Sequence, residues 1–467
     1  MLSIRNLLVF LLYSSFFVIF SAISLNRYFS VQIFQYDFGI FASMIYQLSQ
    51  FKMAYINHIS LGTIPFLGDH FQPSLTLLSP LFWFIKDIKV LIIEQALVIV
   101  ACAFVIQRIA IKKGLSFFSS LAISIIFLLY AGIENPLVTD WHPEPTAGLF
   151  LVLFIYFFLF GKNKFIAPII AIIFLGFKES NAITLSLFLV SSFLIFPKRR
   201  KEIIIYLLAS IVWFFATIKL LIPYFSDRNY FYSPDLPKSL LDVKLSLEKT
   251  AKYEFVWKSI ASFAFLPLLA RFSLIPVLGE IFIRVFPLHS FFQSFTLGMH
   301  YNFYLGIFLA LASIDGLLFI YKKFKLKNKA MIVSIGFILF TLFFAKKVTH
   351  SPVILATNPT FWRELHPRQD IFDALKKVPR EGSVAAQNNL LSYLVLRDDG
   401  IYTLNKGYMN YDPDLIVADL SEGQNPNNFY PSGLVFMEKE MKLLSKTAGY
   451  KRIETGNKNF YIFKKVD

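Results

Sequence analysis

Long apolar segments separated by short polar ones dominate the chain as far as about residue 345. A helix that crosses a bilayer needs roughly 20 mostly apolar residues. On that rule the pattern predicts about 11 crossings, which begin near residues 7, 88, 116, 145, 164, 182, 203, 258, 272, 301 and 330. The first segment is too long for a signal-peptide core and lacks a small-residue cleavage site before Asn26, so we expect a retained signal anchor. The predicted fold is a polytopic α-helical membrane protein.

Two apolar segments depart from this pattern. Pro73 and Pro80 interrupt the segment 71–85, which favours an interfacial helix that leads into the second span. The segment 260–292 contains prolines and charged residues, and a charge near the middle of a bilayer costs roughly 2.5–3.5 kcal/mol on insertion. For this segment the alternative to two spans is a bent hairpin that faces a cavity.

The pattern becomes polar and mixed from about residue 346 to the end of the sequence. Its periodicity predicts an α/β unit, with helices over 370–378, 388–396 and 436–447 and strands over 382–386, 400–404, 415–419 and 459–464. About 100 residues can bury a core of their own. We therefore divide the chain into a transmembrane domain, 1–345, and a C-terminal extracytoplasmic α/β domain, 346–467.

The charged residues indicate an orientation. Lys and Arg concentrate in short loops at 112–113, 162–164, 198–201 and 322–329, which share one side under an alternating count, and cytoplasmic loops are enriched in these residues. The N-terminus is then cytoplasmic, whereas the C-terminus, the long first loop 26–87 and all seven histidines lie outside. The same loops explain the net charge of +16 without nucleic acid as a partner. A single cysteine, Cys102, excludes an intrachain disulfide.

The motif Tyr36-Asp37-Phe38-Gly39 follows the first apolar segment and contains a candidate catalytic acid. A carboxylate at the membrane surface can accept a proton from an incoming hydroxyl or amine, which would make Asp37 a general base. The alternative, equally compatible with these residues, is that Asp37 caps a helix that begins at Phe38.

The motif Asp140-Trp141-His142-Pro143-Glu144-Pro145 is the sharper signal. Each proline biases the preceding residue towards extended geometry, in which alternate side chains point the same way. Asp140, His142 and Glu144 could then converge on a divalent cation such as Mg²⁺ or Mn²⁺, or on a pyrophosphate that the cation screens. The alternative is a polar helix entry, with Pro145 in the first turn and Glu144 near the positive helix end. We favour the metal site, because three ionisable groups between two apolar spans are costly.

Three further motifs are candidates for substrate binding. Asp69 and His70 follow a glycine and precede a proline, which is also the composition of a solvated turn. Lys178 and Glu179 lie between two spans, where they form an internal ion pair or where Lys178 binds a phosphate. His300 lies at the outer end of a span, in a substrate-contacting cluster or in an ordinary aromatic interface belt.

Together these motifs resemble the predicted membrane proteins of domain-of-unknown-function family 2079. The resemblance covers most of the chain and rests on the segments 36–41, 68–73, 140–144, 178–179 and 384–390. That family in turn looks like glycosyltransferases of the GT-C type, which have many spans, a long first external loop with an acidic residue soon after the first helix, and commonly a soluble C-terminal domain. By this resemblance Asp37 matches the first-loop acid, although it lacks the adjacent second acid of some GT-C enzymes, and Asp140 and Glu144 lie where second-loop acids occur.

The resemblance also implies an activity, since GT-C enzymes use lipid-phosphate-linked sugar donors outside the cytoplasm. We expect a protein of the prokaryotic cytoplasmic (inner) membrane that transfers a sugar from a polyprenyl-phosphate donor to a glycan, lipid or protein acceptor of the envelope. The alternatives are a non-enzymatic lipid or solute transporter or flippase, which would use the charged residues of 260–292 with Lys178 and Glu179, and an envelope assembly scaffold. A glycosyltransferase should bring Asp37 near the second-loop acids, whereas a transporter should show a polar path across the bilayer.

Overall fold

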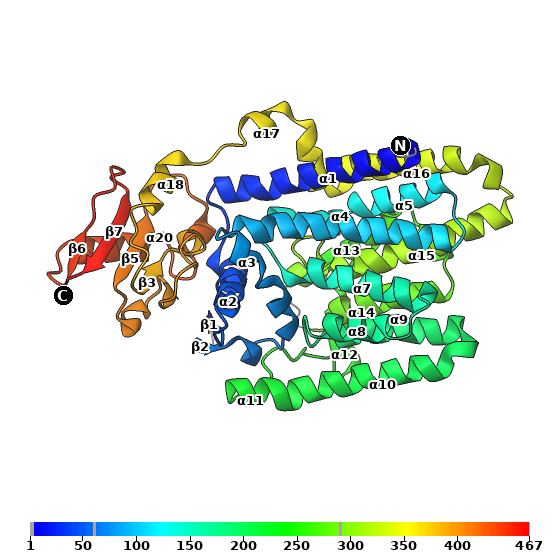
Figure 1. Cartoon of the computed structure of the whole chain (residues 1–467), viewed down its shortest axis with the longest axis horizontal. Coiled ribbons are helices and arrows are strands. Elements are labelled where there is room, and N and C mark those ends of the chain that lie inside the picture. Colours follow the sequence, from blue (N-terminus) through cyan, green and yellow to red (C-terminus); the bar gives the residue numbers. More distant parts are fainter. Residues whose placement is uncertain (1–3, 59–61, 289–291, 467) are drawn as a thin grey trace.

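The computed structural model describes residues 4–58, 62–288 and 292–466. A bundle of roughly aligned helices forms one part of an elongated molecule, and a small sheet domain forms the other end (Figure 1). The bundle contains α1 (Ile4–Phe29), α4 (Lys89–Lys112), α5 (Phe117–Leu128), α6 (Ala131–Val138), α7 (Pro143–Phe160), α8 (Ile166–Leu175), α9 (Asn181–Ile195), α10 (Arg200–Ala216), α13 (Thr250–Ala261), α14 (Ile275–Val285), α15 (Phe303–Lys323) and α16 (Ala330–Phe344).

In the described part of the chain, six helices are long and apolar enough to cross a membrane, or seven if the pair α5 and α6, bent by 45°, counts as one span. The prediction of about 11 crossings is therefore not confirmed. Each apolar segment does form helix, but α8 has only 10 residues, α9 has 15 and α14 has 11. The described part of this apolar segment, 260–288, is divided into short helical pieces, because Pro267 and Pro276 begin new helical turns there.

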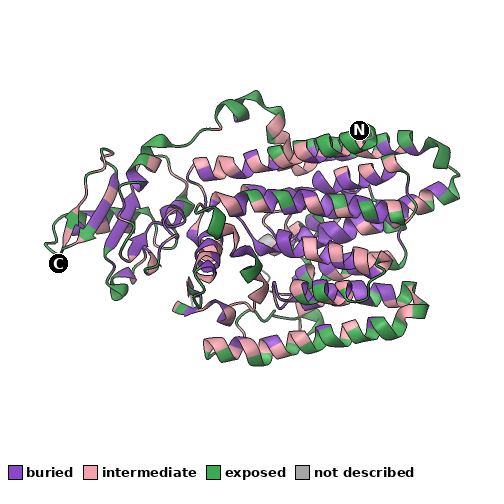
Figure 2. Cartoon of the chain, in the orientation of Figure 1, coloured by how far each residue is buried: buried purple, intermediate pink, exposed green. Residues whose placement is uncertain are grey.

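The long helices differ in how deeply the protein itself covers them. The most apolar parts of α15 and α4 are 72% and 67% buried, whereas those of the helical segments 197–226 and 327–349 are only 17% and 22% buried. Figure 2 shows exposed residues along α10 and α16, which lie at opposite edges of the bundle. Since the exposed positions of these two helices are mostly apolar, they present a lipid-facing surface.

Short elements cover the end of the bundle that faces the sheet domain (Figure 1). The segment after α1 forms α2 (Ile40–Ser49), an antiparallel pair of β1 (Tyr55–His58) and β2 (Gly62–Pro65), and α3 (Leu81–Phe84). The expected interfacial helix over 71–85 is broken into a 3-10 segment, Pro73–Leu78, and α3. The segment after α10 contributes α11 (Ile222–Ser226) and α12 (Leu240–Leu247).

The C-terminal segment forms a five-stranded sheet with the order β4-β3-β5-β7-β6. Its helices α18 and α20 pack on opposite faces, because successive residues of β3 and β5 point alternately to the two sides. The predicted helices and strands are observed in the predicted order, but the pattern did not indicate the short helix α17 or the short, charged edge strand β6. The elements are α17 (Pro359–Arg363), α18 (Gln369–Leu375), β3 (Val384–Ala386), α19 (Asn388–Leu391), β4 (Ile401–Thr403), β5 (Leu415–Asp419), α20 (Leu434–Leu444), β6 (Tyr450–Arg452) and β7 (Phe460–Lys465).

The sheet domain is joined to the bundle at the end of α1. The side chain of Asn389 donates to the carbonyl of Val31 at 3.1 Å, and the Tyr393 hydroxyl donates to the carbonyl of Tyr28 at 2.6 Å. Both donors lie in or just after α19. The chain that follows α1 is therefore held between the bundle and the sheet domain, and this places the motif around Asp37.

Candidate functional site

A cavity of about 420 Å³ lies between the bundle, the loops that cover its end and the sheet domain. Its wall contains every site residue predicted from the sequence except Asp140. The structure thus brings together side chains from five separate segments of the chain, which are Asp37, Asp69 with His70, His142 with Glu144, Lys178 with Glu179, and His300. Its histidines also include His58, whereas His289 lies outside the described residues.

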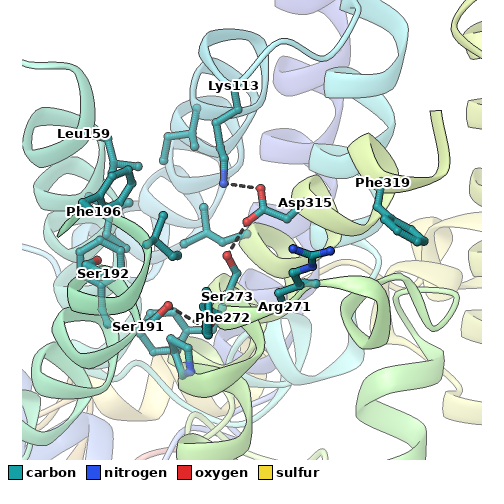
Figure 3. A pocket seen from close by; sticks show the side chains of 18 of the residues that line it. Lys113, Leu159, Ser191, Ser192, Phe196, Arg271, Phe272, Ser273, Asp315 and Phe319 are labelled. Atoms are coloured by element: carbon teal, nitrogen blue, oxygen red, sulfur yellow. Dashed lines mark hydrogen bonds and ion pairs between the residues drawn. The ribbon is translucent and has the colours of Figure 1, made fainter. Parts of the chain in front are cut away.

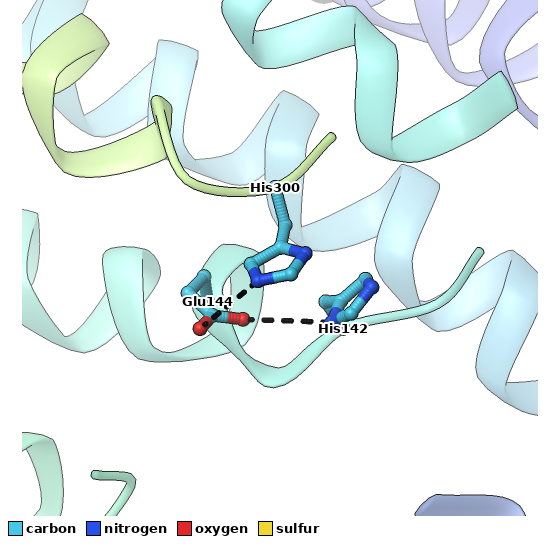
Figure 4. Close-up of side chains that lie close together, drawn as sticks. All are labelled: His142, Glu144 and His300. Atoms are coloured by element: carbon cyan, nitrogen blue, oxygen red, sulfur yellow. Dashed lines mark ion pairs between the residues drawn. The ribbon is translucent and has the colours of Figure 1, made fainter. Parts of the chain in front are cut away.

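His142, Glu144 and His300 form a buried cluster in this wall (Figure 4). The two imidazole rings stack with their centroids 3.5 Å apart. Glu144 lies next to both rings, with Oε2 3.9 Å from His142 Nδ1 and Oε1 3.7 Å from His300 Nε2. Burial lowers the pKa of His142 to about 3 and that of His300 to about 4. Both rings are therefore neutral at pH 7 and can each offer a lone pair.

The local backbone explains why Asp140 is not a member of this cluster. His142 is extended, as the following proline requires, but Pro143 then begins α7, so Glu144 lies in its first turn rather than on a continued strand. Asp140 instead lies outside the cavity, where its Oδ1 accepts from the backbone nitrogen of Phe34 at 3.4 Å. The expected convergence of Asp140 with His142 and Glu144 therefore does not occur. The alternative, in which Glu144 lies in the first turn of a helix, is observed. His142 and Glu144 still form a cluster, in which His300 is the third member.

Lys178 connects the cluster to the rest of the cavity. Its ammonium donates to Glu144 Oε1 at 3.0 Å. Although burial opposes the charge of Lys178, Glu144 and Glu179 raise its pKa above the usual value. Lys178 is thus a cation at every physiological pH, and an ammonium has three donors, so it can also bind an anionic group in the cavity.

Asp37 projects from a strained turn into the same cavity. Its backbone has φ 93° and ψ −91°, a conformation that costs a non-glycine residue on the order of 1–3 kcal/mol. Its carboxylate lies 3.8 Å from His142 Nε2, and 44% of the side chain is exposed. The alternative role as a helix cap is not observed, since α2 begins at Ile40 and no side chain caps it. An accessible carboxylate held in a strained turn is a typical catalytic arrangement.

The sheet domain holds this turn through Asn388. The buried Oδ1 of Asn388 accepts from the backbone nitrogens of Gln35 at 3.1 Å and Tyr36 at 3.3 Å. The Nδ2 atom of Asn388 donates to the carbonyl of Asn427 at 3.0 Å, which anchors the side chain within its own domain. Tyr430 of the same domain packs edge-on against Tyr36 at the cavity wall. The C-terminal domain therefore takes part in shaping the site.

The opposite wall of the cavity is a network of hydrogen bonds around Glu179. Its carboxylate accepts from the Tyr230 hydroxyl at 2.7 Å and from the Phe71 backbone nitrogen at 3.2 Å, and it contacts His70 Nδ1 at 2.8 Å. Although burial opposes ionisation, His70, Lys178 and Tyr230 lower the pKa of Glu179 to about 2. Glu179 is consequently a buried, fully ionised group.

Asp69 completes that wall. It accepts from the Tyr232 hydroxyl at 2.6 Å, and the Tyr232 ring stacks on His70 with centroids 4.3 Å apart. Sequence reasoning did not identify Tyr230, Tyr232, His58, Tyr430 or Asn388 as site residues. The sequence shows the aromatic residues at 230–232 and the two asparagines at 388–389. Their spacing does not show which distant residues they contact.

The fold is that of a helical membrane protein similar to GT-C ArnT. The chain aligns with the crystal structure of ArnT from Cupriavidus metallidurans bound to undecaprenyl phosphate, with a TM-score of 0.56, 10% identity and coverage of 98% of each chain. The apo form of the same protein gives a TM-score of 0.51 at 11% identity over 97% of this chain and 98% of that one. The arabinofuranosyltransferase AftD from mycobacteria gives 0.47 at 11% identity, over 97% of this chain and 40% of that one.

The sequence places the chain in a family. It matches the model of the predicted membrane protein family DUF2079 over residues 27–451, and the chain therefore belongs to this family. A comparison with curated proteins found no match. The expected family and the helical, GT-C-like membrane fold are confirmed.

Proposed function

We propose that the protein is a membrane glycosyltransferase that transfers a sugar from a polyprenyl-phosphate-linked donor to an acceptor of the cell envelope. The observation that carries the proposal is the position of Asp37, whose exposed carboxylate faces the cavity that Lys178 and the buried cluster of His142, Glu144 and His300 also line. The fold likeness to ArnT, which was crystallised with undecaprenyl phosphate, supports a lipid-linked donor.

Each group of residues in the cavity has its own role in the sugar transfer. Asp37 accepts the proton of the acceptor hydroxyl while the acceptor oxygen bonds to the anomeric carbon of the sugar. The bond between that carbon and the phosphate oxygen breaks, and the phosphate leaves with the electron pair. Lys178 stabilises the charge of the leaving phosphate. Glu179, His70, Asp69 and Tyr232 contact the sugar or the acceptor on the opposite wall.

The buried cluster fits a divalent cation. One ligand atom from each of His142, Glu144 and His300 lies within 4.8 Å of the others. Moreover, His142 Nε2, Glu144 Oε2 and His300 Nδ1 are buried without a hydrogen-bond partner among the described residues, which is costly unless a ligand satisfies them. Two imidazoles and a carboxylate favour a metal such as Mn²⁺ or Zn²⁺ over Mg²⁺, which prefers oxygen ligands. A bound cation would screen the leaving phosphate.

Two charged groups that the transporter alternative would use, Glu280 and Arg284, are engaged with each other. Arg284 donates to Glu280 at 2.7 Å, and Thr184 donates to the same carboxylate at 2.7 Å. Lys178 and Glu179 belong to the cavity at the end of the bundle. These contacts favour the transferase over the transporter.

We also propose the arrangement in the membrane. The cavity and the sheet domain lie at the end of the bundle away from the basic loops, which corresponds to the outer face of the prokaryotic cytoplasmic membrane if those loops are cytoplasmic. The donor's polyprenyl chain lies in the membrane, whereas a glycan, lipid or protein acceptor reaches the cavity from outside.

Mass spectrometry of envelope glycans and lipids from a deletion strain tests the proposed function. The expected result is the loss of one sugar from an envelope component together with accumulation of the matching polyprenyl-phosphate sugar. Restoration of the gene should reverse both changes. Unchanged glycans and unchanged lipid-linked sugars in the deletion strain, under growth conditions in which the protein is abundant, would refute the proposal.

A further inference from the structure

A second cavity, of about 400 Å³, lies at the opposite end of the bundle from Asp37. It is formed by the C-terminal parts of α4, α7, α9 and α15 together with the segment 269–276. The site described above lies at the other ends of α7 and α15, where Glu144 and His300 are found. The basic loops that follow α4, α7, α9 and α15 lie at this same end of the bundle (Figure 1).

Charged and polar side chains lie together in the wall of this cavity, namely Lys113, Arg271, Ser273 and Asp315 (Figure 3). The Lys113 ammonium forms an ion pair with Asp315, and the Ser273 hydroxyl donates to the same carboxylate. Figure 3 shows Arg271 beside Asp315. Within the described residues, no hydrogen bond or ion pair engages the guanidinium of Arg271, so its five donors are available. Two cations and one carboxylate leave a net charge of +1, which matches a phosphodiester.

The rest of the wall is apolar. It includes Ile155, Leu159, Phe188, Leu311 and Phe319, which present aliphatic and aromatic carbon to the cavity. Phe319 and Leu269, at 39% and 40% exposure, connect this wall to the outer surface of the bundle. A soluble anion would leave such a surface uncovered, whereas an acyl chain would cover it.

We propose that this second cavity binds an anionic phospholipid of the membrane leaflet at the basic end of the bundle. Arg271 and Lys113 bind the phosphate, and an acyl chain lies along the apolar wall. Asp315 keeps Lys113 in position and leaves a single positive charge for the ligand. An ionisable residue such as Asp315 within a membrane-spanning helix is a functional-site candidate, and anionic lipids gather near basic membrane loops. This site is independent of the proposed transferase activity.

Lipid titration of the purified, delipidated full chain in detergent tests this inference, with bound lipid counted by native mass spectrometry. Phosphatidylglycerol should bind tightly and phosphatidylcholine weakly. Arg271→Gln should weaken phosphatidylglycerol binding about tenfold, the order expected for one charged hydrogen bond, whereas Arg271→Lys should retain most of it. Lys201→Gln removes an exposed charge at the start of α10, outside the cavity, and this variant should bind phosphatidylglycerol as the wild type does.

Three results would overturn the inference. The first is equal binding of phosphatidylglycerol by Arg271→Gln and the wild type. The second is equal binding of phosphatidylcholine and phosphatidylglycerol by the wild type. The third is competition by soluble glycerol phosphate at the concentration at which the lipid binds, because that result would mean a site for a free phosphate. Equal melting temperatures of the lipid-free variants serve as the folding control.

Discussion

The carboxylate of Asp37 lies 3.8 Å from Nε2 of His142, although one residue precedes α2 and the other precedes α7. His142 also stacks on His300 and contacts Glu144. The contact between Asp37 and His142 therefore connects the proposed general base to the cluster proposed to hold a cation and screen the leaving phosphate. Both groups can act on one substrate bound in the cavity.

The orientation of the chain can be tested with reporter fusions. Fusions after Lys201 and Lys325 should report the cytoplasm, because basic loops are retained there. A fusion after Lys465, near the end of the sheet domain, should report the outside. A cytoplasmic signal from that last fusion would place the cavity on the wrong face for a lipid-linked donor used outside the cell.

Metal analysis of purified protein distinguishes the observed cluster from the ligands expected from sequence. We predict a stoichiometric divalent metal in the wild type and its loss in His300→Ala, because removal of a direct ligand should cost more than the roughly 10–100-fold typical of outer-shell changes. Asp140→Asn should keep the metal, since Asp140 lies outside the cavity. His366→Ala is the matched control in an exposed segment. If His300→Ala contained as much metal as the wild type, His300 would not be a metal ligand.

Asn388 should act as a positioning residue for Asp37. Asn388→Ala leaves the backbone nitrogens of Gln35 and Tyr36 without their acceptor, a loss of about 1–3 kcal/mol. We expect transfer to fall while the membrane level stays near normal. Asn388→Asp keeps the acceptor oxygen but loses the donor to Asn427, so it should retain more activity than the alanine variant. Equal activities of the two variants would argue against a positioning role.

The ionised state of Glu179 should stabilise the fold in a pH-dependent way. The pKa of Glu179 is about 2 in the folded protein, whereas the ordinary pKa of a glutamate is 4.5. The stabilisation by ionised Glu179 is therefore complete above about pH 4.5 and is lost as the pH falls towards 2. The difference corresponds to about 3 kcal/mol. Glu179→Gln should lower the melting temperature at pH 7, and the gap to the wild type should narrow at acidic pH. A gap that is constant with pH would contradict this account, and the exposed Glu422→Gln is the control.

Much of the fold could be predicted because its signals are local. The long apolar runs indicated where helix occurs, and the short apolar runs of β5 and β7 indicated strands of the C-terminal sheet. The number of long spans could not be predicted this way. Composition alone does not show that α8 ends after 10 residues or that the chain over 260–288 is divided into short helical pieces, because neighbouring helices decide how much of an apolar run must span the bilayer.

The candidate site was predictable residue by residue but not as a geometry. Charged and histidine residues at the ends of apolar runs pointed to all the charged side chains of the cavity wall and to all its histidines except His58. The alternation expected for Asp140, His142 and Glu144 failed because Pro143 starts a helix, and a local pattern cannot show that His300 takes the vacant place. Asn388 and Tyr430 belong to the site only through the docking of the sheet domain.

Complementation of the deletion strain with Asp37→Asn tests the central claim most directly. The variant keeps the size of the side chain but cannot accept a proton, and loss of a general base typically costs roughly 10²–10⁴ in rate. Asp412→Asn, another aspartate with positive φ but in the sheet domain, is the matched control. At equal membrane abundance, we predict that Asp412→Asn restores the sugar missing from the envelope and that Asp37→Asn does not. Full restoration by Asp37→Asn would contradict the role of Asp37 as the general base.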